Sequence, residues 1–223
     1  IVTRAVDDGE VVMHYHHMSN CGRVLLGMYC HHLHHRRRSG GEFKGISVLN
    51  SVSKAFTIHG TSGARVEAAS IYNHRGAAIY LENGAEHNNT IIGNAIACET
   101  RSSQRDPRCS ITSGVGSQSN ADFGEQSGIY MTSMFSAAII GNAISGQDNA
   151  LFVNQGGKTR GRDEAENLVA PAATRMDVHR DNVFHDCDGF GWYVNRHSLL
   201  QTEIDPETGF VTDWASACAR DFV

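Results

Sequence analysis

Short stretches of alternating apolar and polar residues recur along the chain, separated by corners rich in Asn, Asp, Ser and Gly. The hexapeptide IIGNAI occurs twice, at residues 91–96 and 139–144. A repeated unit of short strands and polar corners is typical of a solenoid. Further related segments cover residues 46–60, 66–84, 139–157 and 178–196.

The apolar positions of these segments fall into one register, at steps of 23, 25, 48 and 39 residues. Steps near about 24 residues, or twice that, suit a right-handed parallel β-helix, in which each coil lies on the coil below. The longer steps require inserted loops, which we place at residues 99–126 and 157–176. The residues that share the register are Val48, Ile71, Ile96, Ile144 and Val183.

We therefore predict an all-β fold, a single right-handed parallel β-helix with inserted loops over residues 1–223. A β-sandwich is disfavoured because Asn-Gly, the usual hairpin turn, occurs between alternating runs only at residues 83–84. The chain opens on IVTRAV without a Met, so we expect a segment of a larger protein.

The alternation within each strand predicts two neighbouring columns of outward side chains, whose members lie about 4.8 Å apart. We call them the polar column and the aromatic column. The polar column contains His34, His59 and Glu82, and continues through Thr132, Asn154 and Asn195. The aromatic column contains His32, Thr57, Tyr80, Tyr130, Phe152 and Tyr193.

Aromatic rings beside polar groups on a flat sheet indicate a polysaccharide groove, because sugar C–H faces pack on rings and hydroxyls need polar partners. The alternative is that the aromatic residues are strand formers, covered by the loops or by another domain. The predicted substrate-binding residues are His32, Tyr80, Tyr130, Phe152, Asn154 and Tyr193.

Histidine is abundant near the N-terminus, where seven of the 13 histidines lie between His14 and His35. Imidazole and carboxylate groups suit a divalent metal such as zinc. No cofactor is required by the sequence, and a divalent metal is the one candidate. The alternative is a hydrogen-bonded ladder in which the carboxylate orients an imidazole. The predicted metal ligands are His32, His34, His59 and Glu82.

Glycoside hydrolysis usually requires two carboxylates roughly 5–10 Å apart. Glu82 and Glu86 are the local candidates, and the predicted catalytic residues are Glu82, His59 and His34. Corner Asp and Asn residues also have a structural explanation, because they cap turns and satisfy backbone groups. Corner residues of this kind are Asn94, Asn142, Asp148, Asp186 and Asp188.

Charge and cysteine content point to the compartment. The formal net charge of −5 gives no support for a nucleic-acid partner, and no apolar run is long enough to span a membrane. Cys98 and Cys109 bracket a polar segment and are predicted to form a disulfide, and Asn88 begins the sole glycosylation sequon. These features favour an extracellular or cell-surface location.

The stretch from Ser53 to Asn94 resembles the parallel β-helix of the family that contains the cell-migration-inducing hyaluronidase, its transmembrane paralogue and the fibrocystin-like receptors. The family patterns G-x-Y-P-x-H-x-H, T-I-H-G-T and F-L-E-D-G-x-E-x-N are similar to GMYCHHLH, TIHGT and YLENGAEHN in this chain. Cys30 replaces the proline of the first pattern, and Asn83 replaces the Asp of the third.

The resemblance implies a module of a secreted or cell-surface glycoprotein that binds polysaccharide or a glycosaminoglycan through its outward columns. One alternative is a hyaluronan-type endoglycosidase, weakened by Asn83 at the position of the acidic residue. Another is an architectural component of a cell-surface or ciliary assembly, in which the columns contact other chains.

Overall fold

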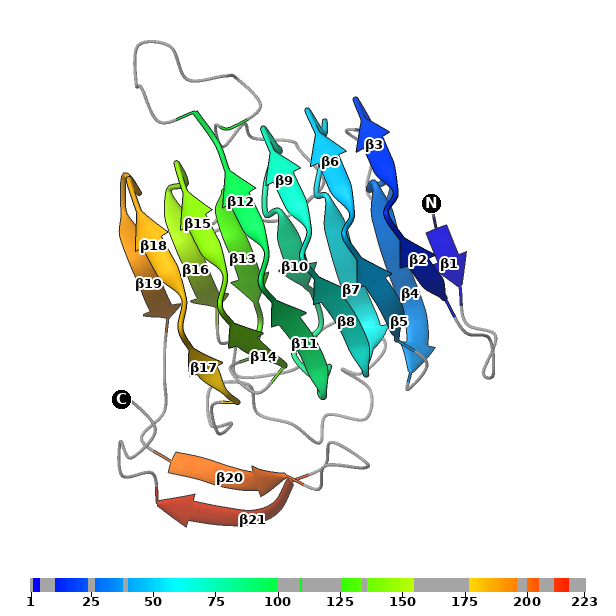
Figure 1. Ribbon diagram of the computed structural model, residues 1–223. Coiled ribbons are helices and arrows are strands. Elements are labelled where there is room, and N and C mark those ends of the chain that lie inside the picture. The colour runs from blue at the N-terminus through cyan, green and yellow to red at the C-terminus, as the bar shows by residue number, and fades with distance from the viewer. Residues whose placement is uncertain are drawn as a thin grey trace.

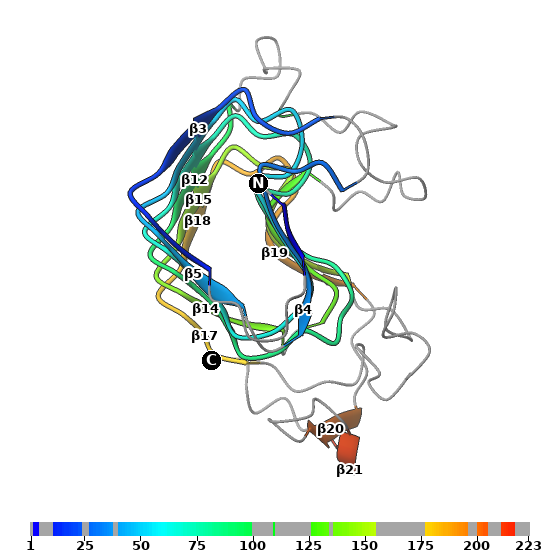
Figure 2. The ribbon, with the colours of Figure 1, turned by 90° about the vertical axis from the view of Figure 1, so that its right-hand side faces the viewer.

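The computed structural model shows coils of short parallel strands stacked along one axis (Figure 1). Figure 2, seen along this axis, shows that each coil has three walls, one from each of three sheets. This arrangement confirms the predicted right-handed parallel β-helix. The residues that the structure describes are 2–4, 11–23, 27–37, 40–99, 109, 126–133, 136–154, 177–195, 200–204 and 211–216.

Sheet A has seven parallel strands and carries both predicted columns. Its strands follow one another at one per coil. They are β1 (Val2–Arg4), β4 (His31–Arg37), β7 (Phe56–Thr61), β10 (Ile79–Leu81), β13 (Ser127–Met131), β16 (Asn149–Asn154) and β19 (Phe190–Asn195).

Sheets B and C have six parallel strands each and form the other two walls. Sheet B contains β2 (Val12–His14), β5 (Gly41–Lys44), β8 (Ala64–Glu67), β11 (Asn89–Ile92), β14 (Ala137–Ile140) and β17 (His179–Arg180). Sheet C contains β3 (His17–Ser19), β6 (Ser47–Leu49), β9 (Ser70–Tyr72), β12 (Ala95–Ala97), β15 (Ala143–Ser145) and β18 (Val183–His185).

Outside the coils, β20 (Leu200–Ile204) and β21 (Val211–Ser216) form an antiparallel pair. No helix in the described part of the chain has the length and hydropathy needed to cross a membrane. Residues 100–108 and 110–125 of the first predicted loop lie outside the described residues, as does all of the second loop, 157–176.

The corner between sheets B and C is made by a single residue with left-handed backbone, at a φ between 51° and 65° in every coil. A Cβ at Gly93 or Gly141 would meet no atom within 4 Å, so glycine serves there for its backbone freedom rather than for space. The corner residues are Tyr15, Gly45, Ala68, Gly93, Gly141 and Asp181.

An asparagine ladder follows this corner through the last three coils. Asn142 Nδ2 donates to the Ile91 carbonyl at 3.0 Å, and its Oδ1 accepts from Asn94 N at 3.0 Å and Asn94 Nδ2 at 2.9 Å. Asn142 Nδ2 also donates to Asn182 Oδ1 at 3.0 Å. These bonds satisfy backbone groups that the sharp corner leaves outside the strand ladders. The prediction that Asn94 and Asn142 brace the corner is confirmed.

The interior is filled by apolar side chains that repeat once per coil. Ile71 pairs with Val48 and Ile96, and Ile96 pairs with Ile144, as the register predicted. The last step was wrong by one residue, because Ile144 pairs with Phe184 and Val183 is 58% exposed. The step is thus 40 residues rather than 39, and Phe184 packs against the core.

Two disulfides lie in the described residues. Cys98 pairs with Cys109, which confirms the prediction. Cys21 pairs with Cys30, a bond that the sequence did not indicate. Cys30 is the residue that replaces the family proline, so a covalent link fixes this turn where the family pattern has a rigid ring. Two disulfides fit an extracellular protein.

Candidate functional site

The aromatic column lies in the predicted register. Strand pairing joins its members from β4 to β19, in the order His32, Thr57, Tyr80, Tyr130, Phe152 and Tyr193. The rings contact one another along the column, with centroids 4.9 Å apart for Tyr80–Tyr130, 5.4 Å for Tyr130–Phe152 and 5.2 Å for Phe152–Tyr193.

The aromatic column is buried from His32 to Phe152 and half-buried at Tyr193, although it faces away from the core. Tyr130 is only 2% exposed, and Tyr80 and Phe152 are buried as well. Asn154 donates from Nδ2 to the Tyr130 hydroxyl at 2.7 Å, which fixes this predicted binding residue against the ring. The burial agrees with the interpretation that these rings are covered, and their role in polysaccharide binding stays a prediction.

A buried lysine connects this column to the histidines. The Lys54 ammonium lies 5.1 Å from the centroid of the Tyr29 ring and 4.5 Å from that of Tyr80. The Tyr29 ring in turn lies 5.0 Å from the ring of His32. Two cation–π contacts help to offset the cost of burying an ammonium. Sequence reasoning missed Lys54, because it precedes β7 and so lies outside the alternating stretch that defines the columns.

The polar column is also in register. His34 of β4 pairs with His59 of β7, and Asn154 pairs with Asn195. Glu82 directly follows β10 and donates its backbone N–H to the Ile58 carbonyl at 3.1 Å, which places it beside His59. Thr132 extends the column, and its hydroxyl donates to the Glu82 carbonyl at 2.8 Å.

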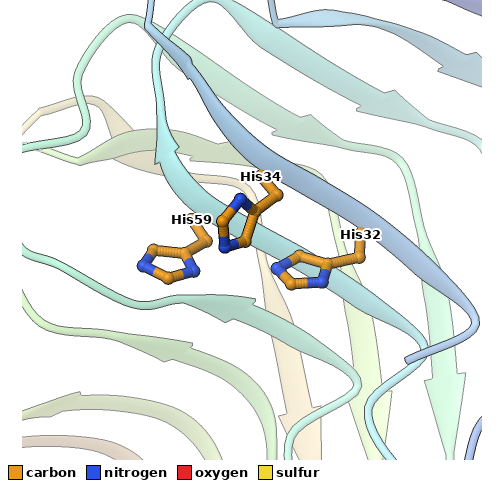
Figure 3. Close-up of side chains that lie close together, drawn as sticks. All are labelled: His32, His34 and His59. Carbon is orange, nitrogen blue, oxygen red and sulfur yellow. The ribbon is translucent and has the colours of Figure 1, made fainter. Parts of the chain in front are cut away.

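Three imidazoles converge at the N-terminal end of these columns, and we call them the histidine cluster. Figure 3 shows His34 between His32 and His59. Each offers one nitrogen, and these atoms lie within 4.8 Å of one another. His32 and His34 share a face because they are two residues apart on β4, and His59 is added by pairing of β4 with β7.

Two of the three imidazoles, those of His32 and His59, are held in their neutral form. His32 donates from Nδ1 to the Gly27 carbonyl at 3.0 Å, so the lone pair of this ring is on Nε2. Burial lowers the pKa of His32 to about 4. Burial, followed by the neighbouring His35, His34 and His32, lowers the pKa of His59 to about 3. Neutral imidazoles are the form that binds a metal ion.

Glu82 lies beside the histidine cluster. Its Oε2 is 3.4 Å from Nδ1 of His59, and both side chains are partly exposed. A carboxylate that orients an imidazole is the usual outer partner of a metal-binding histidine. Of the four predicted metal ligands, the structure thus groups the three histidines and puts the carboxylate next to one of them.

The family model described as CEMIP beta-helix matches residues 4–192. The chain belongs to this family. The matched span covers the histidine cluster and the coils of sheets B and C, which confirms the resemblance predicted from the sequence. Among curated proteins, no sequence matches the chain closely.

In this CEMIP beta-helix chain, a fourth imidazole adjoins the cluster. The ring of His35 lies 4.4 Å from that of His34 and 4.3 Å from that of His59. Gly60 makes room for it, because a Cβ there would overlap Nδ1 of His35. Sequence reasoning missed His35, since strict alternation along a strand puts it on the inner face. The irregular pairing between His34 and Arg37 breaks that alternation.

The second candidate carboxylate has a structural role in the CEMIP beta-helix chain. Glu86 is buried, and its carboxylate accepts backbone N–H groups from Asn83, Gly84 and Gly60. Burial raises its pKa to about 7, while these backbone donors act in the opposite direction. Because its oxygens are enclosed by backbone, Glu86 does not form an open catalytic pair with Glu82.

The remaining predicted residues lie elsewhere. Asp148 is on the corner after β15, whereas Asp186 and Asp188 are on the corner after β18, all several strands from β7 in sheet A. Asp186 contacts its neighbour His185, with Oδ2 2.8 Å from Nδ1. Asn88 is exposed, so a glycan there would meet solvent, and its glycosylation stays a prediction.

Proposed function

We propose that the chain is an extracellular or cell-surface module that binds an anionic polysaccharide of the hyaluronan type at the histidine cluster, with a divalent metal as cofactor. The observation that carries the proposal is the convergence of three imidazole nitrogens within 4.8 Å on the outer face of sheet A. Membership of the CEMIP beta-helix family supports the choice of polysaccharide.

The donor set fits a divalent metal. Three histidines with an adjacent carboxylate are typical of zinc sites that keep a position open for a further ligand. A bound cation would supply positive charge for a sugar carboxylate. That charge matters because the chain has a formal net charge of −5, which disfavours a polyanion elsewhere on its surface. Glu82 then orients His59 rather than contacting the sugar.

The proposal is tested by retention of hyaluronan on immobilised protein, with added Zn²⁺ and with a chelator. We expect retention with Zn²⁺, loss with the chelator, and loss in His34→Ala and His59→Ala. His17→Ala on β3 of sheet C is the matched control, because it removes an exposed imidazole far from the cluster. Equal retention by all of these proteins, with or without metal, would refute the proposal.

Hyaluronan cleavage is the second candidate function. It is favoured by the Glu82–His59 contact, because a carboxylate beside a neutral imidazole can move a proton to or from a bound substrate. We expect the wild type to shorten hyaluronan in a size-exclusion assay, and Glu82→Gln to abolish this. If the wild type retains hyaluronan but leaves its size unchanged, the chain binds the polysaccharide without cleaving it, and the second candidate function is wrong.

A further inference from the structure

We propose that Glu86 is a positioning residue of the histidine cluster. Its carboxylate joins the backbone that follows His59 to the backbone that follows Glu82, and so sets how these two side chains face each other. The inference deepens the proposed function and rests on it for the metal, but not for the geometry.

The contacts of Glu86 span two coils. Oε1 accepts the N–H of Asn83 at 2.7 Å and the N–H of Gly60 at 3.1 Å. Oε2 accepts the N–H of Gly84 at 2.7 Å. Gly60 is the residue after His59, and Asn83 is the residue after Glu82. One carboxylate oxygen therefore holds together the chain segments that carry these two site residues.

Regular strand pairing ends where Glu86 acts. Strand β10 ends at Leu81, and the N–H of Glu82 makes the last ladder bond, to Ile58. Beyond this point β7 continues to Thr61, with no β10 residue opposite it. The backbone donors of the buried Asn83 and the half-buried Gly60 then need another acceptor, because N–H groups shielded from water are rarely left unpaired. Glu86 provides that acceptor.

The acceptor that joins these two backbone segments is a carboxylate rather than a neutral group. Glu86 is fully enclosed, and a buried carboxylate is costly unless several donors compensate it. Charge-assisted hydrogen bonds to backbone N–H groups are shorter and stronger than neutral ones. In its ionised form, which prevails above its pKa of about 7, the group therefore fixes the segment more rigidly than a neutral acceptor would, which suits a site that requires defined geometry.

The hydrogen bond between Glu86 and the Gly60 N–H also affects the neighbouring imidazoles, because Gly60 packs directly against His35. The φ of Gly60 is 53°, which is left-handed, and a Cβ at this position would overlap the ring of His35. The His35 ring lies 4.3 Å from the ring of His59. The His35 ring thus fills the space that a side chain at residue 60 would take, so the position of the Gly60 backbone determines how closely this ring lies to His59.

The test compares Glu86→Gln and Glu86→Asp with the wild type by titration with Co²⁺, whose visible absorption reports the geometry of its ligands. We expect Glu86→Gln to weaken Co²⁺ binding roughly tenfold, as outer partners of a metal site do, and to change the absorption spectrum. Glu86→Asp keeps the charge but is one methylene shorter, so a partial recovery supports a positional role.

Asn142→Ala is the control, because it removes a buried backbone brace on the corner between sheets B and C, away from the cluster. It should lower stability and leave the Co²⁺ spectrum unchanged. In metal-free protein, nitrogen NMR shifts of the His59 ring should move in Glu86→Gln and stay constant in Asn142→Ala. If the wild type fails to bind Co²⁺, the proposed metal site is wrong, and these shifts still decide the inference. Unchanged His59 shifts in folded Glu86→Gln would overturn it.

Discussion

The outer faces of sheets A and C come from the same coils but carry different side chains. On sheet A the outward side chains of the aromatic column are buried from Thr57 to Phe152, and their rings are in contact from Tyr80 to Tyr193. On sheet C the outward residues are small or exposed, such as Ser70, Ala95 and Ala143, and its strands contain no Asp, Glu, Lys or Arg. The inward residues fill the core in both sheets, so the outward residues can differ from one sheet to another. This difference supports the proposal that the site lies on sheet A.

The largest expected difference between the two faces is in stability. Tyr130→Ala on sheet A removes a 2% exposed ring that contacts Tyr80 and Phe152, and should cost about 3–5 kcal/mol in free energy of unfolding. Tyr72→Ala on sheet C removes the same side chain at 43% exposure, and should cost under about 1 kcal/mol. Urea unfolding of both variants measures these two losses in the free energy of unfolding. Losses of similar size would contradict the prediction.

The next difference concerns metal affinity. His59→Ala removes a member of the histidine cluster, and the loss of Zn²⁺ affinity should exceed the roughly 10–100-fold that outer-partner changes produce. His185→Ala removes an exposed imidazole of sheet C and should leave the affinity unchanged. Isothermal titration calorimetry of both variants decides this. A comparable loss in His185→Ala would show that Zn²⁺ binds outside the cluster.

A smaller effect, when counted per pH unit, is expected at the corner that joins sheet C to sheet A. His74 is buried there and donates from Nδ1 to the Gly76 carbonyl at 2.8 Å, and burial lowers its pKa from 6.5 to about 4. Above pH 6.5 the ring is neutral in both states. As the pH falls from 6.5 towards 4, the His74 ring takes up a proton in the unfolded chain but not in the folded one. This one group should therefore lower stability by about 1.4 kcal/mol per pH unit, in addition to the other histidines whose pKa is lowered by burial.

Replacement of His74 by Asn tests this, because Asn retains a side-chain donor but does not titrate. The free energy of unfolding of the variant should depend less steeply on pH between 6.5 and 4 than that of the wild type. The two proteins should follow parallel curves above pH 6.5. An identical slope in the acid range would mean that His74 is not the source of the pH dependence.

Much of the fold followed from the sequence because a coil repeats its inward positions. The two IIGNAI segments set the register, and Asn94 and Asn142 were recognised as corner braces because both belong to that repeat. The register failed at Val183, where the preceding step is long and two adjacent apolar residues compete for one inward position. Phe184 takes it, as the larger of the two apolar side chains.

The candidate site was only partly predictable for a related reason. Alternation gave the outward columns, so the grouping of His32, His34 and His59 could be anticipated. It could not give the burial of the aromatic column, since alternation tells which way a side chain points and not what lies over it. His35 was missed because it lies where strand pairing becomes irregular. Lys54 was missed because it precedes β7, which begins at Phe56, and so lies outside the alternating stretch that defines the columns.

The smallest expected effect is that of a charge added to the outer face of sheet C. Ala95→Lys places a charge on its exposed outer face and should change the free energy of unfolding by no more than about 0.5 kcal/mol. Hyaluronan retention should be unchanged, because the histidine cluster is on the opposite wall of the coil (Figure 2). Thr57→Lys is the matched substitution on sheet A, where the outward side chain is buried, and it should lower both stability and retention. A change of retention in folded Ala95→Lys, in either direction, would instead assign polysaccharide binding to sheet C, because a lysine there can obstruct or attract only a polyanion that lies on that sheet.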